Sequence, residues 1–511
     1  METIKMENFG RAENSKKFSC NKKEDNKIFD KVAEIAASRG FFWPTAEIYS
    51  DKLAGFFEYG PNGLALKNNI LQVWREELIE KENMIEIDGC QILPKSVFQA
   101  SGHLKNFDDP LITCSKCGFK TRADKLIQDI TKQEIPEKLE NEKYDELLKK
   151  NKIVCPKCKS FFNKTERWNM MLKTGVGAEL KEAYFRPETC QSIFVNFPRI
   201  FKTCRVKLPF GIAQTGKVFR NEIAPRQGLI REREINQMEI EIFFNPEKEN
   251  DFNLNPVKKE ILPIYLKDKL QRVSSEESVK KNIVKSKLVA YYLSRLKQFY
   301  LKLGIPEDKM RFRYVNENDR PFYSKETWDF EVQVSTGWLE LCACNHRGDY
   351  DLSGHQKASK QSFEIVDESV GKKILPNVFE LSAGVDRTLY AILELTYKEE
   401  PKDDRTIFSF PKSLSPVQVA IFPLVNKEGM PELSKKVYAL LKPQFKCFYD
   451  ESGSIGRRYR RQDEIGTMWC ITVDGQTLKD NSITIRNRDN MTQIRLPINK
   501  IIDYLNKSSS K

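Results

Sequence analysis

The sequence predicts an α+β fold in which long antiparallel strands are joined by helical segments. Apolar and polar residues alternate at 231–244 and 330–344, which is the spacing of a strand with one buried face. Apolar residues recur three and four positions apart at 27–38 and 63–82, which is the spacing of an amphipathic helix. Long strands with helical insertions between them indicate an α+β domain, which we expect to span residues 27–410.

The character of the sequence changes near residue 410. Pro411, Pro416 and Pro423 accompany the start of a buried strand pattern, after which strands and helices alternate. This pattern predicts a second, mixed α/β domain at 411–511, whose size of about 100 residues is typical of an independent domain.

Polar segments precede and interrupt the first domain. Residues 131–152 are rich in lysine and glutamate with few apolar residues, which indicates an exposed helical insertion, and 245–300 is again charged and helical. We expect, in order, a polar tail at 1–26, an insertion at 104–170 and a helical insertion at 245–305.

The overall charge suggests an anionic partner. The chain has 511 residues, a net charge of +13 and 12 cysteines. Nucleic acid would explain the charge, but so would a generally lysine-rich composition, because the lysines are spread over the whole chain. No run of about 18 apolar residues exists, so we expect no membrane span. Cysteines without a secretion signal fit a reducing compartment, and we expect a cytoplasmic protein.

Two cysteine pairs predict a structural zinc site. CSKCG at 114–118 and CPKC at 155–158 each place two thiolates on one tight turn, and two such turns can complete a tetrahedral site. The separation exceeds that of most zinc ribbons, and the second pair has no following glycine. A closed site with four cysteines would be structural rather than catalytic. The expected ligands are Cys114, Cys117, Cys155 and Cys158.

One phosphate-loop pattern is a false match. GIAQTGKV at 211–218 has Val218 where a phosphate loop needs Ser or Thr, and Pro225 follows where a helix should begin. The chain also has only three histidines and no hydrolase motif. A reaction driven by arginines and carboxylates, such as phosphoryl or nucleotidyl transfer, fits this composition better.

The most unusual pattern is a charged hairpin. Arg220 and Glu222 are expected on one face of a strand at 218–222, and arginines at 231 and 233 begin a returning strand that carries glutamates. The plain interpretation is a solvated hairpin with ion pairs. The alternative is that these charges face a highly charged ligand.

The complete pattern resembles the glycyl-tRNA synthetases of class II. The resemblance runs collinearly over about residues 28 to 506 and implies a class II antiparallel-sheet catalytic domain followed by an anticodon-binding domain. It is carried by motif 1 at 60–94, motif 2 in FRNEIAPRQGLIREREINQMEIE, motif 3 in ELSAGVDRTLYAIL, and by ASGHLKNFDDPL, RADKLI, AYFRPETCQSIF and GWLELCACNHRGDYDLSGH.

The resemblance implies that ATP and Mg²⁺ activate glycine to glycyl-adenylate, and that the glycyl group then passes to tRNA(Gly). Arg220 would hold the α-phosphate, and Glu222 would read the adenine amino group. Arg231 and Arg387 would bind the distal phosphates. Arg220 and Arg387 are the expected catalytic residues. The expected ATP-binding set is Arg220, Asn221, Glu222, Ile230, Arg231, Ile235, Glu340, Leu341, Gly384 and Arg387.

The resemblance also implies an acidic pocket for the glycine ammonium group, since glycine has no side chain to recognise. Ser382 would help to exclude a substrate β-carbon by closing space. For each glutamate the plain interpretation is an ordinary ion pair. The expected glycine-binding set is Arg122, Glu188, Gln237, Glu239, Glu380 and Ser382.

Three residues depart from the family pattern. Ala343 replaces a glycine, Asn345 replaces an alanine, and Leu381 replaces a proline. The nucleotide arginines are all present, so we expect activity, with the wall around Ala343 as the uncertain part.

Partners follow from the same resemblance. Motif 1 implies a homodimer, and the arginine-rich segment at 454–470 suits phosphate contacts and base stacking by the second domain. A non-catalytic nucleic-acid-binding relative of this fold is the alternative, but such a relative would be expected to lose its ATP arginines. A class II synthetase for serine or alanine is a second alternative, against which the glutamates argue.

Overall fold

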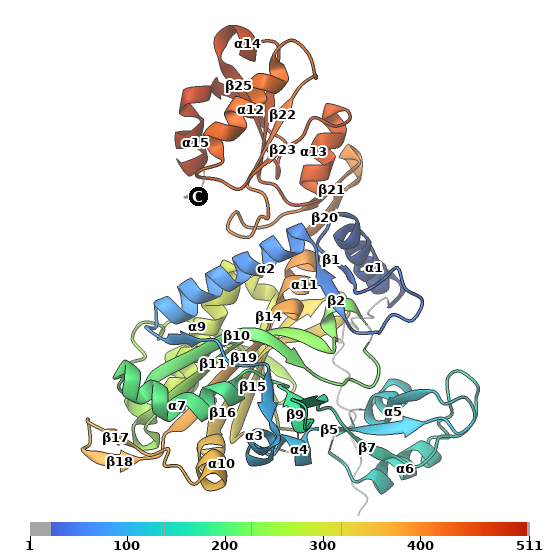
Figure 1. The fold of residues 1–511 in the computed structure, drawn as a ribbon, viewed down its shortest axis with the longest axis vertical. Helices are drawn as coiled ribbons and strands as arrows, with labels where there is room; N and C mark the ends of the chain where they lie inside the picture. The colour runs from blue at the N-terminus through green and yellow to red at the C-terminus, as the bar shows by residue number, and fades with distance from the viewer. Residues whose placement is uncertain (1–21, 134, 137, 226, 318, 508–511) are drawn as a thin grey trace, which may run out of the picture.

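The computed structural model describes residues 22–133, 135, 136, 138–225, 227–317 and 319–507 (Figure 1). Its centre is a nine-stranded sheet with the order β13-β12-β14-β15-β16-β19-β11-β10-β3. Neighbouring strands in this sheet are antiparallel, except for the parallel pairs β10–β3 and β12–β14. The strands are β3 (Ile85–Ile87), β10 (Phe210–Phe219), β11 (Glu234–Phe244), β12 (Ile261–Leu266), β13 (Lys269–Ser274), β14 (Met310–Tyr314), β15 (Glu326–Val334), β16 (Gly337–Gly348) and β19 (Asn377–Gly384).

Strand β11 of the central sheet has one face in a hydrophobic core and one polar face. Met238, Ile240 and Ile242 are fully buried in the main core, so the intervening Gln237, Glu239 and Glu241 face the other side of the sheet. Helices that supply the main core are α2 (Pro61–Trp74), α9 (Lys287–Lys302) and α11 (Val385–Thr396). Helices α7 (Cys190–Cys204) and α10 (Tyr350–Ser359) contribute to a smaller core on the polar face.

Smaller elements surround the sheet. Residues 1–21 of the predicted tail lie outside the described residues, and the first helix begins at Lys22 rather than residue 27. These elements are α1 (Lys22–Ser38), β1 (Phe42–Pro44), β2 (Phe57–Tyr59), the π-helical continuation of α2 (Arg75–Glu80), β4 (Ile92–Pro94), α3 (Lys95–Ala100), α4 (His103–Asn106), β8 (Lys173–Val176), β9 (Lys181–Phe185), β17 (Ile365–Asp367), β18 (Lys372–Ile374), β20 (Tyr397–Glu400) and β21 (Arg405–Phe408).

The segment predicted as a helical insertion at 245–305 also contains strands. It includes a two-stranded hairpin, in which Leu262, Ile264 and Val273 are buried in the main core. The charged residues around them mask this strand pattern in the sequence. The hairpin of β12 and β13 extends the central sheet at one edge. A short helix α8 (Ser275–Lys280) and the longer α9 follow it, so the helical prediction describes only the second half of this segment.

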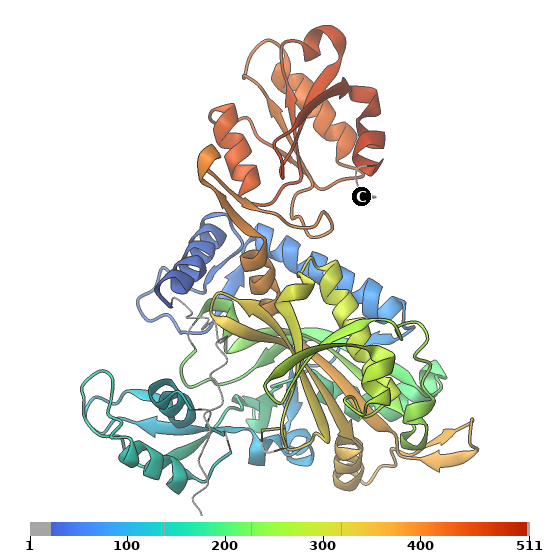
Figure 2. The same ribbon diagram turned by 180° about the vertical axis from the view of Figure 1, so that it is seen from behind.

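The cysteine-containing insertion projects from the side of the sheet (Figures 1 and 2). It is built on a three-stranded sheet with the order β6-β5-β7 and has its own small apolar core, which includes Ile112, Ile127 and Tyr144. Its elements are β5 (Asp108–Thr113), β6 (Lys120–Arg122), α5 (Ala123–Thr131), α6 (Asn141–Lys150) and β7 (Glu166–Asn169).

The C-terminal part has a separate core and stands beyond α2 (Figure 1). Its five-stranded sheet has the order β23-β22-β24-β25-β26. No helix among the described residues is long and apolar enough to cross a membrane. The elements are β22 (Val419–Pro423), α12 (Met430–Leu441), β23 (Cys447–Tyr449), α13 (Ile455–Asp463), β24 (Trp469–Val473), α14 (Thr477–Asp480), β25 (Ser482–Asn487), β26 (Gln493–Pro497) and α15 (Ile501–Lys507).

Candidate active site

Carboxyl groups from three segments meet on the polar face of the sheet. Register places Glu239 opposite Ser382 and Glu241 opposite Glu380, so β11 and β19 present these side chains side by side. Glu188 joins them from the turn that precedes α7, and all four glutamates are buried. The sheet and the start of α7 therefore form an acidic pocket.

Hydrogen bonds fix most of the pocket. Thr189 Oγ1 donates to Glu239 Oε2 over 2.5 Å, and the amide of Gln237 donates to Glu239 Oε1 over 3.2 Å and to Ser382 Oγ over 2.6 Å. Gln191 Nε2 donates to Glu188 Oε1 over 3.0 Å. Five of the six residues expected to bind glycine thus lie around one pocket or are linked to it by hydrogen bonds.

Arg122 is the sixth expected glycine contact, and it forms ion pairs within the insertion. Its Nη1 is 3.0 Å from Asp109 and its Nη2 is 2.6 Å from Asp124, inside the insertion. These two aspartates offset its charge and fix its side chain at the edge of β6.

Arg347 is a pocket residue to which the sequence alone assigns no role. It is fully buried, and its Nη1 donates to Glu380 Oε1 over 2.7 Å. Its Nε and Nη2 donate to the two oxygens of Asp351 over 2.7 and 2.9 Å. The guanidinium also lies over the Tyr323 ring at 3.7 Å. A single cation thus neutralises part of an otherwise anionic pocket.

Asn345, one of the three departures from the family pattern, also acts on this pocket. Its Nδ2 donates to Glu380 Oε2 over 2.6 Å, and its Oδ1 accepts from Thr327 over 2.8 Å. Asn345 and Arg347 therefore hold one oxygen of Glu380 each. Leu381, which stands where the family has proline, is buried in the main core. This departure therefore lies on the face of the sheet opposite to the acidic pocket.

Burial makes Glu239 and Glu380 hard to ionise, whereas the charges of His103 and Arg347 overcome burial at Glu188 and hold its pKa well below the ordinary value. Burial and the charge of Glu188 raise the pKa of Glu239, and burial raises the pKa of Glu380 to about 8, despite the opposing effect of Arg347. Such crowded carboxyl groups cannot all be charged unless a cation joins them.

The raised pKa of Glu380 predicts a pH-dependent stability. Below its ordinary value of 4.5 the carboxyl group is protonated in both folded and unfolded chains. Between 4.5 and about 8 only the unfolded chain has lost the proton, so the free energy of unfolding falls as pH rises. The test compares the free energy of unfolding in urea of wild type and Glu380→Gln. Burial lowers the pKa of His355, which is present in both proteins, so its contribution cancels in this comparison. The stability of wild type relative to this variant should decline through that range, and a rise would contradict the assignment.

The charged hairpin differs from the predicted strand. Strand β10 ends at Phe219, because Glu222 N–H turns back to the Arg220 carbonyl over 2.7 Å. Arg220 therefore lies in a loop, where its Nε donates to the Pro187 carbonyl over 3.1 Å and its guanidinium lies over the Phe107 ring. This contact places Arg220 beside the turn that carries Glu188.

The other nucleotide candidates converge on the same loop. Arg231 Nη2 and Glu222 Oε2 form an ion pair of 2.7 Å. Arg387 donates to the carbonyl groups of Ile230 and Glu340, each over 3.1 Å, and thereby connects the loop to β16. Glu222 is thus paired with an arginine, as the plain interpretation expected, and a nucleotide that binds both residues must separate them.

The remaining nucleotide candidates offer less direct chemistry. Asn221 contributes its backbone, which bonds to the Met170 carbonyl and accepts from Trp168 Nε1, each over 2.8 Å. Gly384 pairs with Gln237 at the end of β19, Ile235 is half-buried at the start of β11, and Leu341 is buried in the core.

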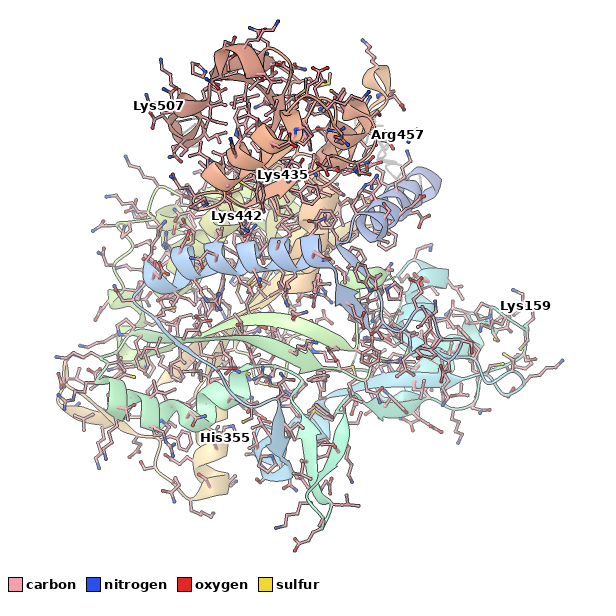
Figure 3. All side chains as sticks on the ribbon, turned by 45° about the horizontal axis from the view of Figure 1, so that its top comes forward. Lys159, His355, Lys435, Lys442, Arg457 and Lys507 are labelled. Carbon is pink, nitrogen blue, oxygen red and sulfur yellow. The ribbon has the colours of Figure 1, made fainter. Side chains whose placement is uncertain are left out.

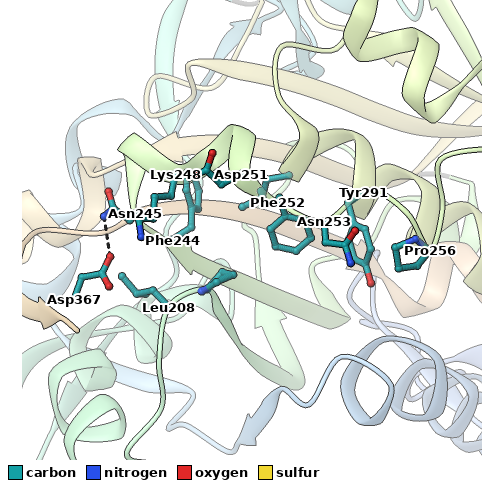
Figure 4. Close-up of a pocket in the computed structure, with 12 residues that line it drawn as sticks. Leu208, Phe244, Asn245, Lys248, Asp251, Phe252, Asn253, Pro256, Tyr291 and Asp367 are labelled. Carbon is teal, nitrogen blue, oxygen red and sulfur yellow. Dashed lines mark hydrogen bonds between the residues drawn. The ribbon is translucent and has the colours of Figure 1, made fainter. Parts of the chain in front are cut away.

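A mainly apolar cavity lies apart from the acidic pocket. It measures about 380 Å³ and lies beyond the end of β11, near Phe244, Phe252 and Tyr291 (Figure 4). Glu239 lies five residues back along the strand, on the order of 17 Å away. Asn245 there donates to Asp367 over 2.8 Å. The acidic pocket and this cavity are therefore separate.

The four predicted zinc ligands come together in the insertion. Their sulfur atoms all lie within 4.8 Å of one another. Gly118 and Lys159, which follow the second cysteine of each pair, have similar left-handed backbone angles, with φ of 68° and 61°. The two turns are therefore alike although the second lacks glycine, and four cysteines in this arrangement suit a tetrahedral zinc ion.

The arginine-rich segment of the C-terminal part is largely structural. Arg458 is buried and donates to the Gly453 carbonyl, and Arg461 pairs with Asp450. Tyr459 donates to or accepts from Thr472 over 2.6 Å and packs against Phe422. Arg457 is exposed on this helix and points away from the fold (Figure 3). Tyr459 and two of the arginines thus contact the domain itself, and base stacking by the segment at 454–470 stays a prediction.

Two family models match the chain. The tRNA synthetase class II core domain (G, H, P, S and T) matches residues 176–396, and the anticodon binding domain matches residues 418–508. The chain is 37% identical to the glycine–tRNA ligase of Methanococcus maripaludis, over 93% of this chain and 99% of that protein. It is 36% identical to that of Methanocaldococcus jannaschii, over 94% and 98% of the two chains. The chain belongs to the glycine–tRNA ligase family.

Solved structures agree on the fold of this glycine–tRNA ligase family member. Prolyl-tRNA synthetase from Giardia lamblia in complex with prolyl-adenylate has a TM-score of 0.60 at 14% identity, covering 94% of this chain and 75% of that chain. The enzyme from Cryptosporidium parvum, complexed with halofuginone and AMPPNP, has a TM-score of 0.58 at 14% identity, covering 95% and 79%. The predicted class II fold with its C-terminal anticodon-binding domain is confirmed.

Proposed function

We infer that this chain is a glycine–tRNA ligase, which activates glycine with ATP and transfers the glycyl group to tRNA. Membership in the family supports the overall reaction, and the buried acidic pocket is the single observation that supports glycine as the amino acid. Buried carboxyl groups favour a small cation as their partner, and the ammonium group of glycine is such a cation. The alternative of a non-catalytic nucleic-acid-binding relative has no support among the relatives.

The direct test is charging of tRNA with radiolabelled glycine, alanine and serine. Only glycine should give acid-precipitable product that depends on both ATP and tRNA. Product with serine or alanine at a comparable rate would show that the pocket has been assigned to the wrong amino acid.

Arg220 is the proposed group for the reacting phosphate. Its planar guanidinium can bind two phosphate oxygens and spread the charge that develops when the glycine carboxylate attacks. Arg387 and Arg231 would hold the distal phosphates, and Glu222 would bind the adenine. Class II synthetases use ATP with Mg²⁺, and Glu340, a partly exposed carboxylate beside Arg387, suits the hard cation, which would offset phosphate charge.

The ammonium group of glycine is the proposed ligand of Glu188, Glu239 and Glu380. These carboxylates would orient glycine so that its own carboxylate points toward Arg220. Gln237 and Ser382, joined by a hydrogen bond of 2.6 Å, would close the space that a substrate β-carbon needs.

The four cysteines of the insertion are proposed to bind a structural zinc ion. Purified protein should contain one zinc per chain by metal analysis, and Cys114→Ser should lose it and melt at lower temperature, because metal binding stabilises such small modules. Cys204→Ser is the matched control, since Cys204 is an exposed cysteine on α7. Full zinc content in Cys114→Ser would remove this assignment.

A homodimer is proposed through the edge of the central sheet. Strand β3, which follows α2 in motif 1, pairs only with β10 among the described strands and ends the sheet there. Sedimentation equilibrium should give twice the chain mass of 59.5 kDa. We also propose domain limits at 27–410 and 411–511. The proposed location is the cytoplasm, where tRNA is charged and used.

A further inference from the structure

Glu241 is a buried carboxyl group with no assigned role. It is fully buried on β11, two residues beyond Glu239 and on the same face. Among the described residues, neither of its carboxyl oxygens has a hydrogen-bond partner. A buried carboxyl group without donors is costly as an anion, so such a group calls for an explanation.

The geometry places Glu241 within reach of the proposed ammonium site. Ligand atoms of Cys190, Glu239, Glu241 and Glu380 all lie within 4.8 Å of one another. A cation bound between Glu239 and Glu380 is therefore also close to Glu241, in surroundings where charges interact strongly. Gln214 on β10 is paired with Glu239 on the adjacent strand β11. Its side-chain amide atoms also have no hydrogen-bond partner among the described residues, so this part of the pocket has unpaired polar groups.

Glu241 differs from its neighbours in how its charge is offset. Glu380 accepts from Arg347 and Asn345, and Glu239 accepts from Thr189 and Gln237, which favours their charged forms. The charged or titratable groups that face Glu241 are Glu239 on its own strand, Glu380 on β19, Arg347 on β16, Asp351 on α10 and Cys190 on α7.

Acidic groups outnumber cations around Glu241. Burial raises the pKa of Glu241 well above its ordinary value, and the charge of Glu380 adds to the effect, while Arg347 opposes it. Of the three sheet carboxyl groups, Glu241 is the one for which the described residues supply no hydrogen-bond donor. It is therefore the group that carries a proton most easily when no second cation is present.

We propose that Glu241 is a fourth carboxyl group of the ammonium pocket, and that it releases its proton to solvent when the ammonium group of glycine binds. The inference rests on the proposed glycine activation. The proton that leaves Glu241 offsets the positive charge that enters with the substrate, in addition to any proton that Glu380 loses when the ammonium group binds. Glu241 is a positioning residue here, since Glu239 and Glu380 make the direct contacts.

The test compares wild type with Glu241→Gln, which keeps the shape of the side chain but cannot titrate. The KM for glycine in ATP–pyrophosphate exchange is measured between about pH 6 and 9, above the range in which an ordinary carboxyl group titrates. The wild-type KM should fall as pH rises, and the fall should be shallower in the variant. At the alkaline end the variant should have a KM on the order of tenfold higher, which corresponds to about one pKa unit.

Calorimetry gives an independent readout. Titration of glycine in buffers with different ionisation enthalpies measures the protons released per glycine bound, and Glu241→Gln should release fewer than wild type. Glu241→Met, apolar and of similar length, should behave like Glu241→Gln if the first variant folds poorly. Glu326→Gln is the matched control, because Glu326 is a buried sheet carboxyl group whose pKa burial also raises, outside the pocket.

The outcomes separate this inference from the proposed function. Absence of glycine-dependent exchange in wild type would remove the function itself. Exchange in wild type, with no proton release on glycine binding or with the same pH profile in wild type and Glu241→Gln, would overturn only the role of Glu241.

Discussion

Replacing Arg220 by Ala is expected to lower glycine-dependent ATP–pyrophosphate exchange by about 100- to 1,000-fold, the range found when a donor that stabilises transition-state charge is removed. The loss should fall on kcat more than on the KM for glycine, because the guanidinium would act mainly on the charge that develops at the α-phosphate. Steady-state exchange at varied ATP and glycine measures both quantities.

The contacts of Arg220 make this result interpretable. Its side chain makes one hydrogen bond to a carbonyl and lies over Phe107, so its removal should cost little stability. Arg220→Lys should remain strongly impaired, since an ammonium group cannot form the planar two-point contact. Arg199→Ala, at an exposed position on α7, is the control and should exchange normally. If Arg220→Ala still binds tRNA and its ATP–pyrophosphate exchange is the same as that of wild type, the role assigned to Arg220 is wrong.

Replacing Arg347 by Met is expected to lower the free energy of unfolding by about 3–5 kcal/mol, the usual cost of breaking a buried ion pair from one side. The variant would leave Asp351 and Glu380 buried without the guanidinium that bridges them. Urea denaturation at neutral pH measures the loss.

The partners of Arg347 provide the controls. Arg347→Lys keeps the charge but not the three hydrogen bonds, so its stability should lie between those of wild type and Arg347→Met. A loss below about 1 kcal/mol in Arg347→Met, the scale of an exposed pair, would show that this pair does not hold the pocket together.

The sequence was informative where chemistry depends on local spacing. The alternation of polar and apolar residues is enough to assign Gln237 and Glu239 to one face of β11 and Met238 and Ile240 to the other. The two CxxC pairs likewise indicate their common site through their spacing. The resemblance then brings Glu188 and Glu380 into the same pocket from distant segments, which periodicity alone could not do.

The parts that the sequence missed depend on long-range packing. Arg347 and Asn345 act through Glu380, and only the register between β16 and β19 shows that Asn345 lies opposite it. The hairpin of β12 and β13 was hidden by charged residues on its exposed face. The sequence also could not show that Arg458 and Tyr459, in the arginine-rich segment, contact their own domain.

The most direct test of the account is glycine-dependent ATP–pyrophosphate exchange by the purified wild-type protein, measured against a blank without amino acid. The account predicts exchange with glycine well above the blank, and little or none with alanine or serine. No exchange above the blank with glycine, under conditions where the protein is folded, would contradict the central claim that the acidic pocket binds glycine for activation.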